Sequence, residues 1–425
     1  MRKPSILIIV FFFFSLGLSA QEQQKVQLSS QQIETLFLRE NLQIIAESMN
    51  IDMAEAEIAQ ARLWDNPELS ISSVNLWSSK KQREEVDMNR FPKNTQFSVE
   101  LSQLIQIAKK RGKQVRKEKI SKEITTQDFQ ELLKSLKLEL RQSICEMYYL
   151  QSYLHVLTIQ DEALDKLIGT YKRQVTQGNI AKVELLRLQS SQLDLESEIN
   201  EVKTELNSQQ KNIKVLINAS PNIQIEIAAV DNSNPSPNEI SLSKLLEMAY
   251  ESRPNIKRQQ LQSQYHEMSI AYEKAARMSD LSFSVNYDRY GGVWKDFIGF
   301  GVSFDLPFLN RNQGNIKLAR INYTQSLHLE QWEQNLAQHE ISEGLLNYTE
   351  AYNFYKKLSE NELLSELDDM LGVYTKNLLN KNISMLEYID FMDAYRSNKQ
   401  AILTAYKKLN TSFEELQFVT GTDIK

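Results

Sequence analysis

Side chains that could carry out chemistry are scattered along this sequence and form no catalytic or metal-binding set. The four histidines lie far apart on long helical patterns, where surface or packing roles are expected: His155, His266, His328 and His339. Cys145 is the single cysteine, which excludes intramolecular disulfides and cysteine-based metal clusters. Gly291-Gly292 falls in a turn between two strands and precedes no helix, so a phosphate-binding loop is not expected. The eleven methionines show no paired spacing. We therefore expect no enzyme, no cofactor and no resident metal.

The remaining candidates for a functional site are two short polar turns and the carboxylates that follow them. Gly178-Asn179 and Lys381-Asn382 each interrupt a long helical pattern, and Gly178 is expected to adopt a positive φ. Acidic side chains follow both turns: Glu184 after the first, Glu387 and Asp390 after the second. Ser384-x-x-Glu387 matches a capping box, in which serine and glutamate satisfy the first N–H groups of a helix. This gives Glu387 a structural role before any functional one.

The first twenty residues have the layout of a secretory signal peptide. Arg2 and Lys3 precede an apolar run from Ile6 to Leu18, and Ala20 offers a small residue for cleavage before Gln21. The run is too short for a lasting membrane anchor. The pattern predicts an exported protein from which residues 1–20 are removed.

Charge and composition narrow the classes of partner. The formal net charge is −6, and we find no concentrated basic footprint of the kind that marks nucleic-acid binding. Nucleic acid is therefore not an expected partner. No stretch after Ala20 approaches the ~20 apolar residues of a membrane helix. Only 12 glycines and 8 prolines occur in 425 residues, which indicates long regular elements.

The sequence repeats itself, and each half predicts helix, strand, strand, helix, helix in that order. We place the first repeat at residues 21–217 and the second at 241–425. Residues 218–240 form a Pro/Asn/Ser-rich connector with room for one strand. The segment GNIAKVELLR (178–187) matches KNISMLEYID (381–390), 203 residues further along the chain.

The two long helices set the dimensions of each half. For the first half we predict a helix over 31–66, strands at about 68–77 and 95–104, a long helix over 113–177 and a return helix over 182–217. For the second half we predict a helix over 241–278, strands at about 281–290 and 297–306, a long helix over 314–379 and a return helix over 384–418. A helix of ~65 residues spans ~95 Å, which matches two helices of ~35 residues laid end to end. Both return helices carry apolar residues at alternating spacings of three and four, which is typical of coiled coils.

Alternation in the strands decides which kind of elongated protein this is. Leu281, Phe283, Val285 and Tyr287 would share one face, while polar side chains occupy the other. About ten residues of such alternation are typical of a transmembrane barrel strand, and aromatic girdles are expected near the strand ends: Trp77, Phe91, Tyr290 and Trp294. One such strand could belong to a soluble sheet, but four in an exported, otherwise helical chain favour a barrel. Since even small barrels have about eight strands, closure requires several copies of the chain.

The repeat resembles the TolC-like outer-membrane factors over essentially the whole mature chain. Segments similar to those of the family are NPELSIS, LSQLIQIAKKRGKQVR and NISMLEYIDFMDAYR, and residues 110–114 (KRGKQ) are most similar to the heavy-metal-efflux branch. The resemblance implies a mainly α fold with a membrane β-barrel part. Three copies would form a twelve-stranded barrel in the outer-membrane lipid, continuous with a long α-helical coiled-coil tunnel in the periplasm.

The resemblance also assigns roles to the two turns. They would form the periplasmic tips, which close the tunnel and dock a periplasmic adaptor (membrane fusion) protein: Gly178, Asn179 and Ile180, with Lys381, Asn382 and Ile383. The candidates for a constriction ring are Glu184, Glu387 and Asp390, since three copies of a carboxylate around an axis attract cations. Drug-exporting members carry closing latches near the second tip, where Leu378 and Ile383 stand in this chain.

The function implied is a passive exit duct in the outer membrane of a Gram-negative bacterium. An inner-membrane transporter of the RND type and its adaptor would deliver metal ions or drugs to a homotrimer of this chain. Two alternatives stay open at this point: the outlet of a type I protein secretion system, and a structural periplasmic coiled-coil protein without a pore.

Overall fold

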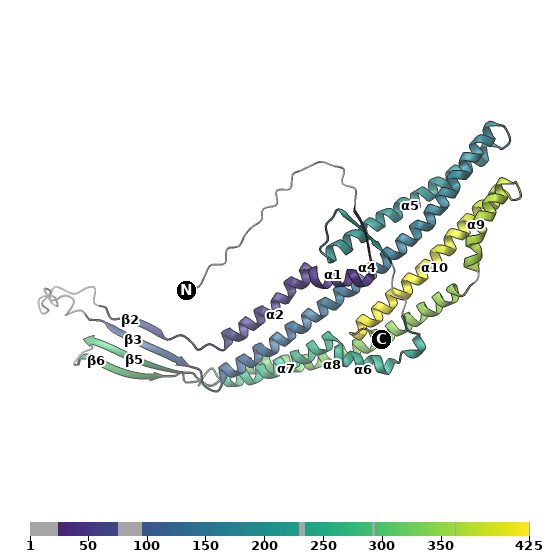
Figure 1. The fold of residues 1–425 in the computed structure, drawn as a ribbon. Helices are drawn as coiled ribbons and strands as arrows, with labels where there is room; N and C mark the ends of the chain where they lie inside the picture. Colours follow the sequence, from purple (N-terminus) through teal and green to yellow (C-terminus); the bar gives the residue numbers. More distant parts are fainter. Residues whose placement is uncertain (1–23, 75–95, 229–233, 291–293, 362, 425) are drawn as a thin grey trace, which may run out of the picture. The chain divides into compact units, whose positions relative to one another are not determined.

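The computed structural model describes residues 24–74, 96–228, 234–290, 294–361 and 363–424, and it is mainly helical, as expected (Figure 1). The chain divides into two compact units. Unit 1 comprises Met1–Asn41, Leu140–Ser233 and Leu358–Lys407, and unit 2 comprises Leu42–Glu139, Asn234–Lys357 and Lys408–Lys425. The predicted signal peptide, Trp77, Phe91 and Gly291-Gly292 lie outside the described residues. None of the described helices combines the length and the apolar content that crossing a membrane requires.

Helices pass from one unit into the other along the chain. The described helices are α1 (Ser30–Glu40), α2 (Leu42–Ala61), α4 (Lys110–Thr176), α5 (Lys182–Leu216), α6 (Leu242–Ser252), α7 (Pro254–Ala276), α8 (Gln313–Ser359), α9 (Leu363–Leu379) and α10 (Met385–Thr420), with a short 3₁₀ turn η2 (Pro237–Glu239). At 67 residues, α4 spans roughly 100 Å. The predicted long first helix and both return helices are confirmed to within three residues at each end.

Unit 1 is built around one apolar core that α4, α5, α9 and α10 share. Its buried side chains include Leu157, Leu167, Leu188, Leu195 and Tyr388. Leu188, Leu195 and Tyr388 are positions of the predicted seams, so the heptad pattern located this core correctly. Burial of apolar side chains along these seams stabilises the helices far more than their intrinsic propensity does.

A two-stranded parallel sheet completes unit 1. Strand β1 (Gln24–Leu28), which the sequence did not predict, pairs with β4 (Ile223–Ile227), the strand expected in the connector. The buried amide of Gln210 binds both backbone groups of Ile225: its Nε2 donates to the carbonyl, and its Oε1 accepts from the N–H at 3.1 Å. Gln210 therefore holds β4 on α5, and the two bonds satisfy both polar atoms of its buried amide.

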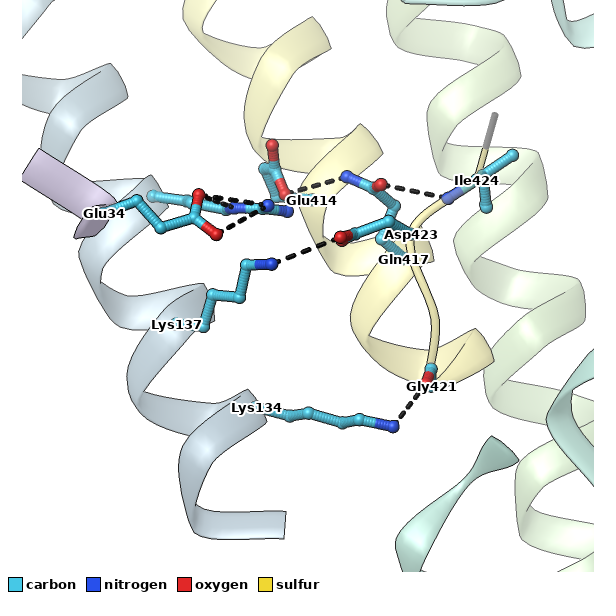
Figure 2. A network of polar contacts seen from close by, with 9 residues as sticks. Glu34, Lys134, Lys137, Glu414, Gln417, Gly421, Asp423 and Ile424 are labelled. Atoms are coloured by element: carbon cyan, nitrogen blue, oxygen red, sulfur yellow. Dashed lines mark hydrogen bonds and ion pairs between the residues drawn. The ribbon is translucent and has the colours of Figure 1, made fainter. Parts of the chain in front are cut away.

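Unit 2 has a second core, formed by α6, α8 and the end of α10. Ile341, Tyr348, Phe413 and Leu416 pack together in it. The end of the chain is held by polar contacts beside this core (Figure 2). Figure 2 shows these contacts: Lys134 donates to the carbonyl of Gly421, Lys137 lies 3.2 Å from Asp423, and the Ile424 N–H donates to Gln417 at 3.1 Å.

Unit 2 also carries a four-stranded antiparallel sheet in the order β2-β3-β5-β6 (Figure 1). The strands are β2 (Glu68–Ser72), β3 (Ser98–Ile105), β5 (Leu281–Tyr290) and β6 (Lys295–Ser303), close to the four predicted strands. Apolar residues face one another across all three pairings. One row runs Leu69, Leu101, Val285, Phe300, and the adjacent row runs Ile71, Val99, Tyr287, Ile298. The predicted alternation of faces is confirmed for the described strands.

Predictions of three unbroken helices were wrong. The helix predicted over 31–66 is broken at Asn41, where the backbone is extended, and it ends at Ala61, before Asn66-Pro67. The helix predicted over 241–278 is broken at Arg253, because the residue before Pro254 is disfavoured in the α region. The helix predicted over 314–379 stops at Ser359 and resumes at Leu363. In the break the Asn361 N–H donates to the carbonyl of Leu358 at 3.2 Å, and serine and asparagine are residues of low helix propensity.

Backbone breaks recur in both halves at one spacing. Three pairs of residues with positive φ lie 203 positions apart: Lys109 and Asn312, Gly178 and Lys381, Asn218 and Gly421. The two extended breaks, Asn41 and Arg253, also correspond. The Asn41 amide donates to the carbonyl of Leu216 at 2.8 Å, and the Arg253 guanidinium donates to that of Val419 at 3.2 Å. In each half, a side chain at the break therefore caps the end of the return helix.

Candidate functional site

The first predicted tip is a tight turn between α4 and α5 in unit 1. Gly178 has φ 75°, as expected for a turn residue of this kind. Its N–H donates to Val175 at 3.0 Å, and the Asn179 N–H donates to Gln174 at 2.9 Å. This pair of bonds is a Schellman motif, which satisfies the last carbonyls of α4.

The second tip, between α9 and α10, repeats the motif without glycine. The Lys381 N–H donates to Leu378 at 3.0 Å and the Asn382 N–H donates to Asn377 at 2.9 Å. Lys381 adopts φ 60°, a left-handed conformation that costs a residue with a Cβ roughly 1 kcal/mol. Leu378 is buried in the core of unit 1, where it can have no latch-like polar role.

One core supports both tips. Ile180 and Ile383, which directly follow the two turns, pack half-buried against the core of unit 1. Each isoleucine therefore anchors its turn to the same set of helices. The structure brings the six predicted tip residues into one unit, on two neighbouring helical hairpins.

The three candidate carboxylates differ in their surroundings. Glu387 and Asp390 are exposed on the first turns of α10, whereas Glu184 is half-buried on α5. Glu184 lies close enough to Tyr171 to contribute, after burial itself, to the raised pKa of that phenol. Glu184 is thus tied to the core of its hairpin, while Glu387 and Asp390 are free to face solvent or a solute.

Glu387 takes part in the predicted capping box. The Ser384 N–H donates to its carboxylate at 2.7 Å, and the Glu387 N–H donates to the Ser384 hydroxyl at 3.3 Å. The Ser384 backbone N–H, and then the Ser384 hydroxyl, lower the pKa of Glu387. The cap therefore stabilises the folded protein at pH values above the ordinary glutamate pKa, and this contribution is lost as the pH falls through the lowered value.

Polar side chains form contacts between helices of the two hairpins that were not predicted from the sequence. Tyr153 donates to Glu198, and Arg396 of α10 lies 3.4 Å from the same carboxylate. Lys399 lies 2.5 Å from Asp368 of α9. Lys399 interrupts the apolar seam of α10, and in the structure this interruption marks an ion pair with α9.

The described residues contain no group of three or more His, Cys, Asp or Glu side chains that could hold a metal ion. Of the four histidines, His266 has a pKa lowered by burial and then by Lys117. It lines a polar hollow together with Asp128 and Arg258, which form an ion pair of 3.3 Å with each other.

The apolar face of the sheet is the other unusual surface. The side chains that share it are largely exposed, including Ile71, Val285, Ile298 and Val302, and Phe300 is 85% exposed. Soluble monomers rarely leave so many contiguous large apolar side chains open to water. None of the described residues of unit 2 covers them.

The sequence pattern of the family described as outer membrane efflux protein matches residues 35–219. This stretch belongs to that family. It contains the second half of α1, all of α2, β2, β3, α4 and α5, and hence the first tip with Gly178 and Glu184. The recognition of an outer-membrane factor from the sequence is thereby confirmed.

Other comparisons agree with this family. The chain is 22% identical over 279 residues to the cobalt-zinc-cadmium resistance protein CzcC of Cupriavidus metallidurans, an alignment covering 65% of this chain and 62% of that protein. The chain thus spans less than two thirds of the length of this relative. CzcC is named for resistance to metals, in keeping with the heavy-metal branch suggested by residues 110–114.

Solved structures extend the similarity of fold to nearly the whole chain. The Campylobacter jejuni CmeC outer membrane channel has a TM-score of 0.75 at 15% identity, covering 98% of this chain and 94% of that one. CusC, described in terms of transmembrane channel formation, has a TM-score of 0.73 at 17% identity, covering 96% of each chain. The open state of the Neisseria gonorrhoeae MtrE outer membrane channel has a TM-score of 0.71 at 13% identity, covering 100% and 98%. The fold of outer membrane channels therefore includes both halves of this protein.

Proposed function

We propose that this chain is the outer-membrane channel subunit of a tripartite efflux system and that it carries out no enzymatic reaction. The observation that carries the proposal is the open apolar face of the sheet, with Phe300 85% exposed, on a fold shared with outer membrane channels. Such a face is stable when hydrocarbon covers it. The long helices that continue from the strands would lie in the periplasm.

The sheet supports a trimer. Its edge strands, β2 and β6, each have one side that pairs with no other described strand. In hydrocarbon, unpaired backbone groups cost several kcal/mol each, so the edges must pair with other copies. Three copies supply twelve strands, enough to close a barrel with β2 of one copy beside β6 of the next. In this assembly residues 21–217 and 241–425 act as two repeats joined by 218–240.

The tips suit the docking of a periplasmic adaptor. Val183 and Leu386 are exposed apolar side chains, 203 residues apart, and each lies one turn beyond its Schellman motif. Two equivalent apolar positions give each chain two similar contact points for the adaptor. An inner-membrane transporter of the RND type would load the duct, and metal ions are the first class of cargo to test, given the similarity to CzcC.

The channel is tested by placing the purified protein in planar lipid bilayers. We expect stepwise increases in conductance, each from one inserted trimer. A folded oligomer that inserts and never conducts would support the structural rod instead. Passage of an unfolded polypeptide in the same bilayers would favour the protein-secretion outlet.

Glu387 and Asp390 are expected to give the pore its preference for cations. The double variant Glu387→Gln, Asp390→Asn removes both charges while glutamine still caps the helix at Ser384. Three copies lose six charges from one narrow region, so we expect cation-to-anion selectivity to fall several-fold and block by multivalent cations to weaken. The reversal potential in a salt gradient measures this. An unchanged reversal potential would remove both residues from the conduction path; Asp194→Asn, further along α5, is the matched control.

A further inference from the structure

Four connections between helices and strands lie together at one end of the sheet of unit 2. They join α2 to β2, β3 to α4, α7 to β5, and β6 to α8, and the antiparallel register places them at the same end (Figure 1). We call this region the collar, and it consists of residues 61–67, 106–119, 272–280 and 304–320. A molecule bound beside the helical end of the sheet would therefore contact the collar.

The collar is strongly basic, although the chain is acidic. Residues 109–119 alone hold seven Lys or Arg and one Glu, and the four segments together hold thirteen basic and five acidic side chains. The formal charge of the whole chain is −6. We predicted no basic footprint of the kind that marks nucleic-acid binding, and that prediction stays untested. The collar is a local concentration of basic side chains: seven of the thirteen lie within residues 109–119, and the folded sheet brings three further segments to them.

Part of this charge is used within the protein. Lys110 is buried and lies 2.8 Å from Asp280. The Arg111 guanidinium stacks 3.7 Å from the ring of Trp64, and Lys117 lies about 5 Å from the rings of Tyr265 and Tyr272. These contacts fix the collar in place.

Most of the remaining basic side chains are exposed. Five of these, which form no ion pair among the described residues, represent all four segments: Arg62, Lys109, Arg116, Arg277 and Arg311. Lys and Arg side chains are commonly exposed to water, so their exposure alone indicates no ligand. Five like charges gathered at one end of a sheet repel one another, and this repulsion favours the binding of a counter-charge.

Large apolar side chains are interleaved with these cations. Trp64 is 61% exposed, Phe308 is 70% exposed and Leu309 is 94% exposed. Aromatic and long basic side chains are enriched where a membrane protein crosses from hydrocarbon to headgroups. The apolar face of the sheet ends at the collar, so the collar lies at the depth where headgroups would begin. A nucleic acid would satisfy the charges and leave Phe308 and Leu309 in water.

We propose that the collar binds the phosphate groups of anionic phospholipids in the membrane leaflet that faces the long helices. The guanidinium and ammonium groups pair with headgroup phosphates, and Trp64, Phe308 and Leu309 enter the outer part of the acyl layer. This inference rests on the proposed function, because it requires the sheet to lie in a bilayer. It adds a preference for lipid charge, which a pore as such does not need.

The probes are phosphatidylglycerol and phosphatidylcholine with identical acyl chains, added to the full-length protein in detergent. We expect native mass spectrometry to show phosphatidylglycerol retained over phosphatidylcholine, with a preference that declines steeply as salt rises. The variant Lys109→Gln, Arg277→Gln, Arg311→Gln should lower that preference about tenfold, since each basic side chain near an anionic surface contributes measurably to binding. The control variant Lys166→Gln, Lys203→Gln, Lys211→Gln removes three exposed charges from unit 1 and should leave it unchanged.

Equal retention of both lipids by the unmodified protein would overturn the inference, as would an equal loss in both variants. The salt dependence of the unmodified protein provides this test even if the collar variant fails to fold. Conductance in bilayers of pure phosphatidylcholine separates the two proposals. Pore formation there with no lipid preference would leave the channel intact and remove the collar's role.

Discussion

Replacing Arg253 by methionine should lower the free energy of unfolding by about 3 to 5 kcal/mol. Arg253 is 7% exposed and donates to Glu340 and to the carbonyl of Val419, and it lies 3.8 Å from Glu333, which is itself buried. Methionine fills a similar volume and leaves both carboxylates without their cation. It also uncaps α10. Unfolding in urea of the detergent-solubilised protein, followed by circular dichroism, measures the change.

Two further variants separate the buried charge from a general effect of losing an arginine. Arg258, on α7, makes ion pairs with Asp128 at 3.3 Å and Glu131 at 3.1 Å but is only partly buried. Arg258→Met should cost about 1 kcal/mol or less. Adding Glu333→Gln to Arg253→Met should recover part of the loss, because one unpaired buried charge is removed. Equal losses from the two arginine variants would contradict the role assigned to Arg253.

Replacing Phe300 by lysine should impair membrane insertion by about 2 to 4 kcal/mol per chain. Phe300 lies mid-strand on the apolar face, across from Val285. In a soluble sheet a side chain 85% exposed could become lysine at a cost within about 0.5 kcal/mol. The large effect is therefore expected only if hydrocarbon covers this face. Folding into lipid vesicles at graded urea concentrations measures it.

Asn286 provides the matched control on the opposite face. It pairs with Gly299, the neighbour of Phe300, and so lies at nearly the same depth. Asn286→Lys should insert almost normally, because its side chain faces the interior of the proposed barrel. Equal impairment by the two substitutions would show that the predicted inside and outside faces are not distinguished by lipid.

Sequence reasoning succeeded where one local pattern is repeated over many residues. The alternation of Phe283 and Val285 with serine and asparagine fixed the strands and their faces, because a shift of one residue would exchange the two faces. Leu188 and Leu195 located the core of unit 1 because apolar residues recur at spacings of three and four along α5. Gly178 located a turn because few other residues adopt positive φ at no cost.

It failed where a contact joins residues distant in the chain. The break at Asn41 has no local signal, since its amide is held by the carbonyl of Leu216, 175 residues away. Pro254 is a local signal for the break at Arg253. Because the two halves repeat, a corresponding break could have been predicted at Asn41. Lys381 adopts a positive φ that its side chain disfavours, because the Schellman bonds of the turn outweigh the cost. The basic stretch 109–119 is visible in the sequence, but the three other segments of the collar could not be assigned to it without the register of the sheet.

The central claim is that one copy of this chain cannot complete its own membrane sheet. The mass of the purified mature protein, measured by light scattering in detergent and again after detergent removal, tests it most directly. We expect three chains per particle in detergent and aggregation, not a monodisperse solution, once detergent is absent. A stable, water-soluble single chain would contradict the account.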